Sequence, residues 1–266
     1  MPLTKKEWEN LVTDIHLGKI NAIGEGSFKK IYMKNNKVYT FEDMKQNSGE
    51  IYKLLNQLDT SYILKPNDIF LCANKRYLEM EYCKGDANDE TGITINLLKD
   101  MDEKQFQKNF IGLEDAVKKL HAVNVVALDV KPENMLINCG DSNSIVLTDL
   151  DGAIIDNKGD EHLTPDFFYS LNFSQDNIEN YKKNDLFALY ISFIEIMNPG
   201  IEEAYGTSMF RFAMKSALGI DAGLNSIVKN IKDSKKIKYK ELTNTYTDKL
   251  LRLSDGGEKE TDKLKF

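Results

Sequence analysis

ALDVKPENMLINCGDSNSIVLTDLDG, residues 127–152, is the stretch that decides the interpretation of this chain. Two apolar runs within it, MLI and IVL, flank a polar turn and predict a β-hairpin. The hairpin would bring Asp129, Asn134 and Asp149 around one point. Phosphoryl transfer needs such a cluster, because a carboxylate must accept the proton of the attacking hydroxyl while oxygen ligands hold Mg²⁺ on the ATP phosphates.

The run DVKPEN, which begins at Asp129, resembles the D-x-K-P-x-N catalytic loop of the eukaryotic-type protein kinase superfamily. The run DLD, which begins at Asp149, stands where that family carries Asp-Phe-Gly. The resemblance implies an α+β, bilobal protein-kinase-like fold with a small β-rich N-lobe and a larger helical C-lobe. It also implies that Asp129 is the catalytic base and that Lys131 steadies the γ-phosphate. The implied Mg²⁺ ligands are Asn134 and Asp149.

Composition and charge place the chain among soluble globular proteins. Of its 266 residues 41% are hydrophobic and 29% are charged, and the formal net charge is −7 with no basic block. These features argue against nucleic acid or an anionic membrane as a partner. The longest apolar run, residues 186–197, is too short to span a membrane and predicts a buried core helix. A monomer is the expected state.

The three cysteines, Cys72, Cys83 and Cys139, show neither a disulfide framework nor metal-ligand spacing, which fits a reducing compartment. No apolar segment typical of a signal peptide follows the N-terminal lysines. We therefore expect a cytoplasmic protein, located in the host-cell cytosol if it is a secreted bacterial effector kinase.

The chain divides into four expected segments: an N-terminal helix over residues 1–19, the N-lobe over 20–84, the C-lobe over 85–253 and a polar tail over 254–266. A capping-box pattern, Thr4-x-x-Glu7, opens the first helix. Apolar residues at helical spacing predict two further helices, over residues 50–58 and 104–122.

The run IGEGSFKKIY, residues 23–32, resembles the kinase loop G-x-G-x-x-G-x-V. In that loop, glycines let the backbone close over the ATP phosphates. Gly24 and Gly26 match the first two glycines of the pattern, whereas Lys29 replaces the third. The resemblance therefore assigns Gly24 and Gly26 to ATP binding.

The next predicted strand, KVYTFE at residues 37–42, lacks the lysine that the family carries there to bind ATP. One alignment puts Phe41 at the place of that lysine. A two-residue turn at residues 35–36 instead puts Glu42 there. Both registers stay open at this point, and neither supplies a lysine.

Lys29 offers a replacement for the missing lysine. It shares a strand face with Ile31, which stands where the family's valine touches adenine, so Lys29 would point toward the phosphates. This arrangement resembles the with-no-lysine kinases, in which a lysine at the third-glycine position does this work. Glu50, in the family's third helix, would pair with it. The alternative is that Lys29 is solvated and the protein is a pseudokinase.

The strand YLEMEY, residues 77–82, resembles the strand that enters the kinase hinge. By that likeness Met80 is the gatekeeper residue. The segment from Glu81 to Cys83 would offer backbone hydrogen bonds to adenine.

Two further residues flank the catalytic loop in this interpretation. Asp185 begins a run that resembles the start of the family's central buried helix, where it would hold the backbone of the catalytic loop. An ordinary N-cap aspartate is the alternative. His121 lacks a second histidine or cysteine at metal-ligand spacing, which favours a structural histidine over a zinc ligand.

The combined interpretation is an ATP- and Mg²⁺-dependent protein serine/threonine kinase that acts on a protein substrate. Lys131, two residues after Asp129, is typical of serine/threonine rather than tyrosine kinases. Two alternatives stay open. One is a pseudokinase scaffold that binds nucleotide and partners. The other is a small-molecule phosphotransferase of the aminoglycoside type, against which Lys131 argues because those enzymes usually carry histidine or asparagine there.

Overall fold

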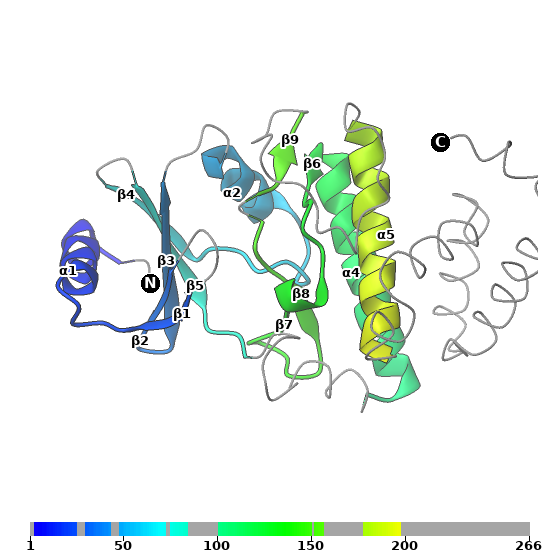
Figure 1. Cartoon of the computed structure of the whole chain (residues 1–266), viewed down its shortest axis with the longest axis horizontal. Helices are drawn as coiled ribbons and strands as arrows, with labels where there is room; N and C mark the ends of the chain where they lie inside the picture. Colours follow the sequence, from blue (N-terminus) through cyan, green and yellow to red (C-terminus); the bar gives the residue numbers. More distant parts are fainter. Residues whose placement is uncertain are drawn as a thin grey trace, which may run out of the picture.

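The computed structural model describes residues 3–25, 30–43, 48–72, 75–84, 101–150, 152–156 and 178–197. Within these ranges the chain has the predicted α+β, two-lobed architecture, with a β-sheet in the N-terminal lobe and long helices in the C-terminal lobe (Figure 1). Gly26, Lys29, residues 85–100 at the start of the predicted C-lobe and the polar tail lie outside the described residues. No helix within these ranges is both long and apolar enough to cross a membrane.

The N-terminal lobe is built on a five-stranded antiparallel sheet. Its strands, in spatial order, are β1 (Ala22–Glu25), β2 (Lys30–Lys34), β3 (Lys37–Asp43), β5 (Lys75–Glu81) and β4 (Asp68–Cys72). Because side chains alternate along a strand, the sheet has two different faces. On β5, Tyr77 belongs to an aromatic cluster on one face and Leu78 to the main core on the other.

Helix α1 (Lys5–His16) begins with the predicted capping box. The backbone N–H of Glu7 donates to the Thr4 hydroxyl at 3.3 Å, and the backbone N–H of Thr4 donates to the Glu7 carboxylate at 2.7 Å. Two otherwise unpaired donors at the helix start are satisfied in this way. After the helix, Gly18 takes a φ of 69°, a conformation that glycine adopts readily.

The outer face of the sheet is covered by α1 (Figure 1). The indole of Trp8 stacks on Phe70 with 5.5 Å between the ring centroids, and meets Tyr39 edge to face. Its N–H donates to the carboxylate of Asp68 at 2.8 Å. Burial of this large aromatic surface, together with a satisfied indole N–H, fastens α1 to the sheet.

The β2–β3 hairpin settles the register of the third strand. Asn35 and Asn36 form its turn with φ of 52° and 61°, as a type I′ turn requires. Ile31 consequently lies opposite Thr40, in agreement with the register predicted for a two-residue turn. Phe41, one residue further on, packs in the aromatic cluster under α1. The alignment that placed Phe41 on the ATP side is therefore wrong, because alternation along the strand turns its ring to the opposite face.

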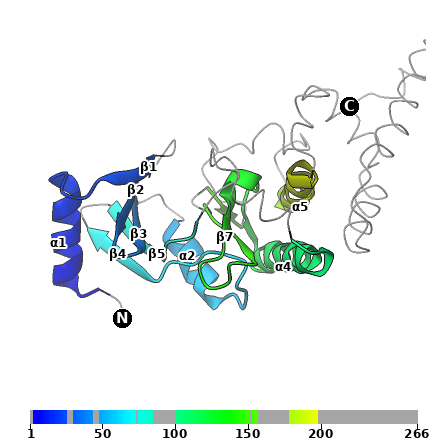
Figure 2. The ribbon, with the colours of Figure 1, turned by 90° about the horizontal axis from the view of Figure 1, so that it is seen from below.

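Helix α2 (Ser48–Gln57) covers the inner face of the sheet. Figure 2 shows it between the sheet and the C-terminal lobe. Ile51, Tyr52 and Leu55 of this helix are buried in the same cluster as Leu78 of β5. The predicted helix over residues 50–58 is thus present, and its apolar side packs on the sheet.

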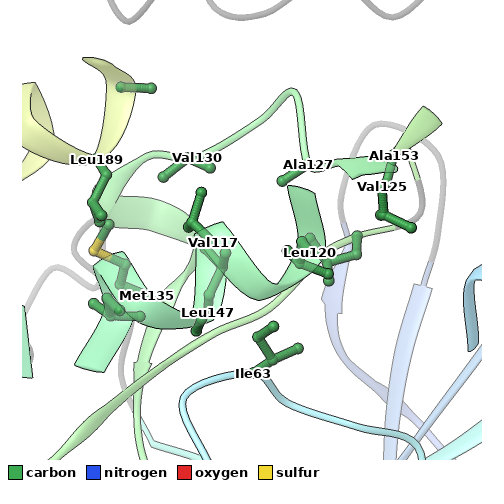
Figure 3. Packing of buried hydrophobic residues seen from close by; sticks show 14 of the residues in the cluster. Ile63, Val117, Leu120, Val125, Ala127, Val130, Met135, Leu147, Ala153 and Leu189 are labelled. Carbon is green, nitrogen blue, oxygen red and sulfur yellow. The ribbon is translucent and has the colours of Figure 1, made fainter. Parts of the chain in front are cut away.

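Helices α4 (Glu103–Ala122) and α5 (Ile178–Met197) frame the C-terminal lobe (Figures 1 and 2). Two short antiparallel pairs pack near them: β6 (Val125–Val126) with β9 (Ile154–Ile155), and β7 (Met135–Ile137) with β8 (Ile145–Leu147). The second pair is the hairpin predicted from the sequence. Figure 3 shows the core that these elements share, which includes Val117, Leu120, Val125, Met135 and Leu147.

Helix α5 begins at Ile178, well before Asp185. Asp185 therefore lies inside the helix, and the N-cap alternative for this residue is wrong. The buried helix predicted over residues 186–197 forms the second part of α5.

The segment after α2 joins the two lobes. The N–H of Leu64 donates to the carbonyl of Leu147 at 2.8 Å, and the N–H of Leu147 donates to the carbonyl of Tyr62 at 2.9 Å. The ring of Tyr62 lies so close to Gly112 of α4 that a Cβ on this glycine would be 2.2 Å from ring atoms. Because Gly112 has no side chain, the Tyr62 ring can pack directly against the backbone of α4.

Candidate active site

The loop between β6 and β7 brings three of the predicted site residues together. A short 3₁₀ helix, η1 (Pro132–Asn134), turns the chain from Lys131 into β7. The ammonium group of Lys131 lies 2.9 Å from Oδ2 of Asp129. The Nδ2 of Asn134 donates to the same oxygen at 3.0 Å. One carboxylate is thus held by a cation and an amide, while its side chain stays partly exposed to solvent.

The amide of Asn134 is fixed in orientation. Its Nδ2 also donates to the backbone carbonyl of Asp129 at 2.7 Å, and the residue is buried. The backbone carbonyl of Asn134 accepts the N–H of Thr148 at 2.9 Å, which connects η1 to the segment that carries Asp149. With both hydrogen bonds made by the nitrogen, the Oδ1 of Asn134 is left as an oxygen donor for a cation.

Asn134 and Asp149 offer the kind of oxygen donors that Mg²⁺ prefers. Within the ranges that the structure describes, no three histidine, cysteine, aspartate or glutamate side chains gather into a larger metal site. Mg²⁺ beside nucleotides is commonly held by one or two protein groups, with phosphate oxygens and water as its other ligands. The residues present therefore fit a Mg²⁺ ion that arrives with ATP.

The backbone is strained at both ends of this site. Leu128 has a φ of 67° and Asp149 a φ of 60°, in the left-handed region that residues with a Cβ rarely adopt. Such conformations cost roughly 1–3 kcal/mol each and persist only where the surroundings hold them. Aspartate is one of the residue types enriched in this region, whereas leucine at position 128 gives no sign of it in the sequence.

Asp185 of α5 binds the backbone of the strained loop through its carboxylate. Its carboxylate accepts the N–H of Ala127 at 2.8 Å and the N–H of Leu128 at 2.9 Å. A ring nitrogen of His121 lies 3.0 Å from the same carboxylate. Asp185 is thus placed as the sequence predicted, and His121 has the structural place expected of it. The contact between His121 and Asp185 was not foreseen, because the two residues are far apart in the chain.

Asp149 is connected to α2 through its neighbour Leu150. Leu150 is buried in the main core, in the same cluster as Ile51 and Leu55 of α2. The residue next to Asp149 and the apolar side of α2 thus belong to one buried cluster.

The predicted ATP-binding residues of the N-terminal lobe are described only in part. Gly24 lies on β1 opposite Ile31 of β2. Gly26 and Lys29 lie outside the described residues, and Glu50 is placed in the first turn of α2 by its backbone alone. The exposed Lys30 alternates with Ile31, so strand geometry puts these neighbours on opposite faces of β2.

The register with the two-residue turn puts Glu42, and not Phe41, on the same face of β3 as Thr40, because side chains alternate along a strand. Thr40 lies opposite Ile31 and is only 2% exposed. Lys37 is at the end of β3, and its ammonium group contacts the carboxylates of Glu79 and Glu81. Among the described side chains of β3, none is a lysine on the α2 side of the sheet.

The predicted hinge residues follow along the end of β5. Met80 lies opposite Val38 of β3 and is partly buried. Glu81 bonds to Lys37, which lowers the pKa of the Glu81 carboxyl and raises the pKa of the lysine. Burial raises the pKa of the Cys83 thiol to about 12, so this thiol stays protonated.

Lys84, which follows the predicted hinge residues, is hydrogen-bonded to the C-terminal lobe. The N–H of Ile137, at the end of β7, donates to the carbonyl of Lys84 at 3.0 Å. Lys84 is thereby held beside the β7–β8 hairpin.

Comparison with known proteins agrees with this geometry. The sequence profile of the protein kinase domain family matches residues 18–207. Aurora/IPL1-related protein kinase 2 from Caenorhabditis elegans is 27% identical over 140 residues, which are 47% of this chain and 44% of that protein. The probable serine/threonine-protein kinase ndrC from Dictyostelium discoideum is 27% identical over 133 residues, which are 45% of this chain and 10% of that protein. The chain thus aligns with less than half of the length of either relative. The family profile matches more than half of this chain, and the chain therefore belongs to the protein kinase domain family.

Proposed function

We propose that this protein transfers the γ-phosphate of Mg-ATP to a serine or threonine hydroxyl of a protein substrate. The observation that carries the proposal is the arrangement around Asp129, whose Oδ2 is contacted by Lys131 and by the Nδ2 of Asn134. Lys131 two residues after Asp129 favours serine/threonine specificity, as do the names of the relatives.

Each residue of this group has a chemical role in the proposal. Asp129 orients the substrate hydroxyl and accepts its proton. Lys131, which lies beside Asp129, is within reach of the phosphoryl group and stabilises its negative charge. Asn134 and Asp149 hold the Mg²⁺ ion, which supplies charge neutralisation at the phosphates when bound. The fixed amide of Asn134 keeps base and metal ligand at a constant spacing.

The direct test is phosphate incorporation by the purified full chain. Incubation with γ-labelled ATP, Mg²⁺ and a generic protein substrate such as casein should give labelled protein, with phosphoserine or phosphothreonine after hydrolysis. Asp129→Ala should reduce kcat strongly and leave nucleotide affinity nearly unchanged, because its interaction forms mainly with the transferring hydroxyl. Labelled phosphotyrosine would contradict the specificity, and label on an aminoglycoside but not on protein would favour the small-molecule alternative.

A nucleotide-binding pseudokinase is the second candidate. The buried Thr40 favours it, because the described part of β3 has no lysine on the α2 side. Under this function the wild-type chain would bind ATP without transferring phosphate. Asp129→Ala would then change neither binding nor the absence of turnover, so the same pair of measurements separates the two functions.

A further inference from the structure

Arg76 of β5 has an unusual place for an arginine. It is 2% exposed, and among the described residues it is the only lysine or arginine in the buried class. A guanidinium group is always charged, and burying it is costly unless the surroundings compensate the charge. Arg76 is not among the residues around Asp129, and its burial belongs to the packing of the N-terminal lobe.

The side of the sheet on which Arg76 lies follows from strand alternation. Arg76 and Leu78 are two residues apart on β5 and therefore share a face. Leu78 is in the main core with α2, whereas Tyr77 between them is in the cluster under α1. Arg76 thus faces α2, and the register places it opposite Glu42 of β3.

Arg76 contacts an aromatic ring of α2. The guanidinium carbon lies 5.0 Å from the centroid of the Tyr52 ring. Tyr52 is itself only 4% exposed. A cation over an aromatic face is attracted by the ring quadrupole, and the attraction is strongest where water is excluded, as at this contact. One buried cation therefore connects the sheet to α2.

We propose that Arg76 is the residue that anchors α2 to the sheet in this protein. In the family that the chain resembles, one lysine of the third strand both binds the ATP phosphates and pairs with the helix. Here β3 has Thr40 on that face, and the two tasks are divided. Arg76 holds the helix through Tyr52, and phosphate binding falls to another cation. Arg76 is thus a positioning residue, and only its effect on turnover rests on the proposed kinase function.

The test is hydrogen exchange of α2 in the full chain without nucleotide. Arg76→Met keeps much of the side chain's length but removes the charge, and should raise exchange of the amides over residues 51–57 roughly tenfold or more. The amides of α4 and of the β2–β3 hairpin should keep their rates. Arg76→Lys keeps a cation and should lie between wild type and Arg76→Met.

Tyr52 provides the matched pair of variants. Tyr52→Phe keeps the aromatic face and should exchange more slowly than Tyr52→Leu. Tyr52→Leu removes the ring and should resemble Arg76→Met. Equal exchange in Arg76→Met and Arg76→Lys, or in Tyr52→Phe and Tyr52→Leu, would overturn the proposal. Uniform loosening of all elements in Arg76→Met would also overturn it, because Arg76 would then support the whole core and not α2.

The exchange measurement is independent of catalysis. If the wild-type chain transfers no phosphate, the proposed function fails while the anchoring of α2 is still decided. If it does transfer phosphate, Arg76→Met should lower kcat with a smaller change in KM for ATP. A change confined to KM would mean that Arg76 acts on the nucleotide and would contradict a positioning role.

Discussion

The Oδ1 of Asp185 accepts a 2.9 Å hydrogen bond from the backbone N–H of Leu128, a leucine held at a φ of 67°. The acceptor is on a buried helix and the donor is in the catalytic loop. The second oxygen binds the neighbouring N–H, so a single carboxylate fixes two successive peptide groups of a strained turn. The position of the catalytic loop therefore depends on the core of the C-terminal lobe.

Asp185→Asn should lower the free energy of unfolding by about 1–3 kcal/mol, the usual cost of a lost hydrogen bond to a buried charged group. The amide has one acceptor oxygen in place of two, and its nitrogen would face a backbone donor. Chemical denaturation measures the loss. Ser192→Ala on the same helix is the control, because its hydroxyl bonds only to the carbonyl of Ala188. Equal losses in the two variants would mean that the loop contacts contribute nothing.

Asp149→Asn should abolish phosphate transfer and weaken binding of Mg-ATP. The carboxylate is the charged member of the proposed Mg²⁺ site, and a neutral amide attracts the ion far less. Titration of nucleotide with and without Mg²⁺ checks the metal role, and thermal unfolding checks that the fold persists. Undiminished turnover in this variant would remove Asp149 from the metal site.

Lys29→Met should reduce kcat/KM by about 10²-fold or more, the scale of losing one preorganised electrostatic group. The ATP phosphates need a cation, and the described part of β3 offers none on the α2 side. Lys30→Met is the matched control, since Lys30 lies on the other face of β2 and its loss should cost little. Similar behaviour of the two variants would rule out the with-no-lysine arrangement.

Gly112→Ala should destabilise the protein, although alanine favours helices over glycine by about 1 kcal/mol. The added Cβ would lie 2.2 Å from the ring of Tyr62, so the ring must move away from α4. A net loss of about 1–3 kcal/mol is expected from such overpacking. In the background of Tyr62→Ala the same change should become neutral or stabilising. Destabilisation in both backgrounds would show that the ring is not the cause.

Tyr39→Phe should make the stability of the protein less dependent on pH in the alkaline range. Burial raises the pKa of the Tyr39 phenol to about 12 from a model-peptide value of 10.0, and the hydroxyl donates to Glu79 at 3.3 Å. A raised pKa stabilises the folded state below the unfolded value, and this contribution is lost as the pH rises from about 10 to 12. Denaturation midpoints across this window should fall less steeply in the variant. If the midpoints of wild type and variant fell in parallel with pH, the loss of stability at alkaline pH would come from groups other than Tyr39.

The elements that could be predicted from the sequence are those with a strong local pattern. The hairpin of β7 and β8 is marked by two apolar runs around a polar turn, and α4 by a long apolar periodicity. The catalytic run at residues 129–134 could be placed because its residues are close in sequence and act together.

What could not be predicted depends on contacts between distant segments. The face of the sheet that Phe41 joins was decided by the type I′ turn and by the aromatic cluster under α1. The start of α5 at Ile178 lies in a stretch of polar residues that shows little apolar periodicity. The burial of Arg76 under α2 has no local signal, since an arginine in a strand is most often solvated.

The contact of Trp8 with Phe70 and Asp68 has an optical consequence. Trp8 is the only tryptophan of the chain and is 2% exposed. Tryptophan fluorescence of the native protein therefore originates entirely at the junction of α1 and the sheet. Far-ultraviolet circular dichroism, by contrast, receives most of its signal from the helices. A denaturation experiment that follows both signals would show, without any added label, whether α1 separates from the sheet before the helices melt.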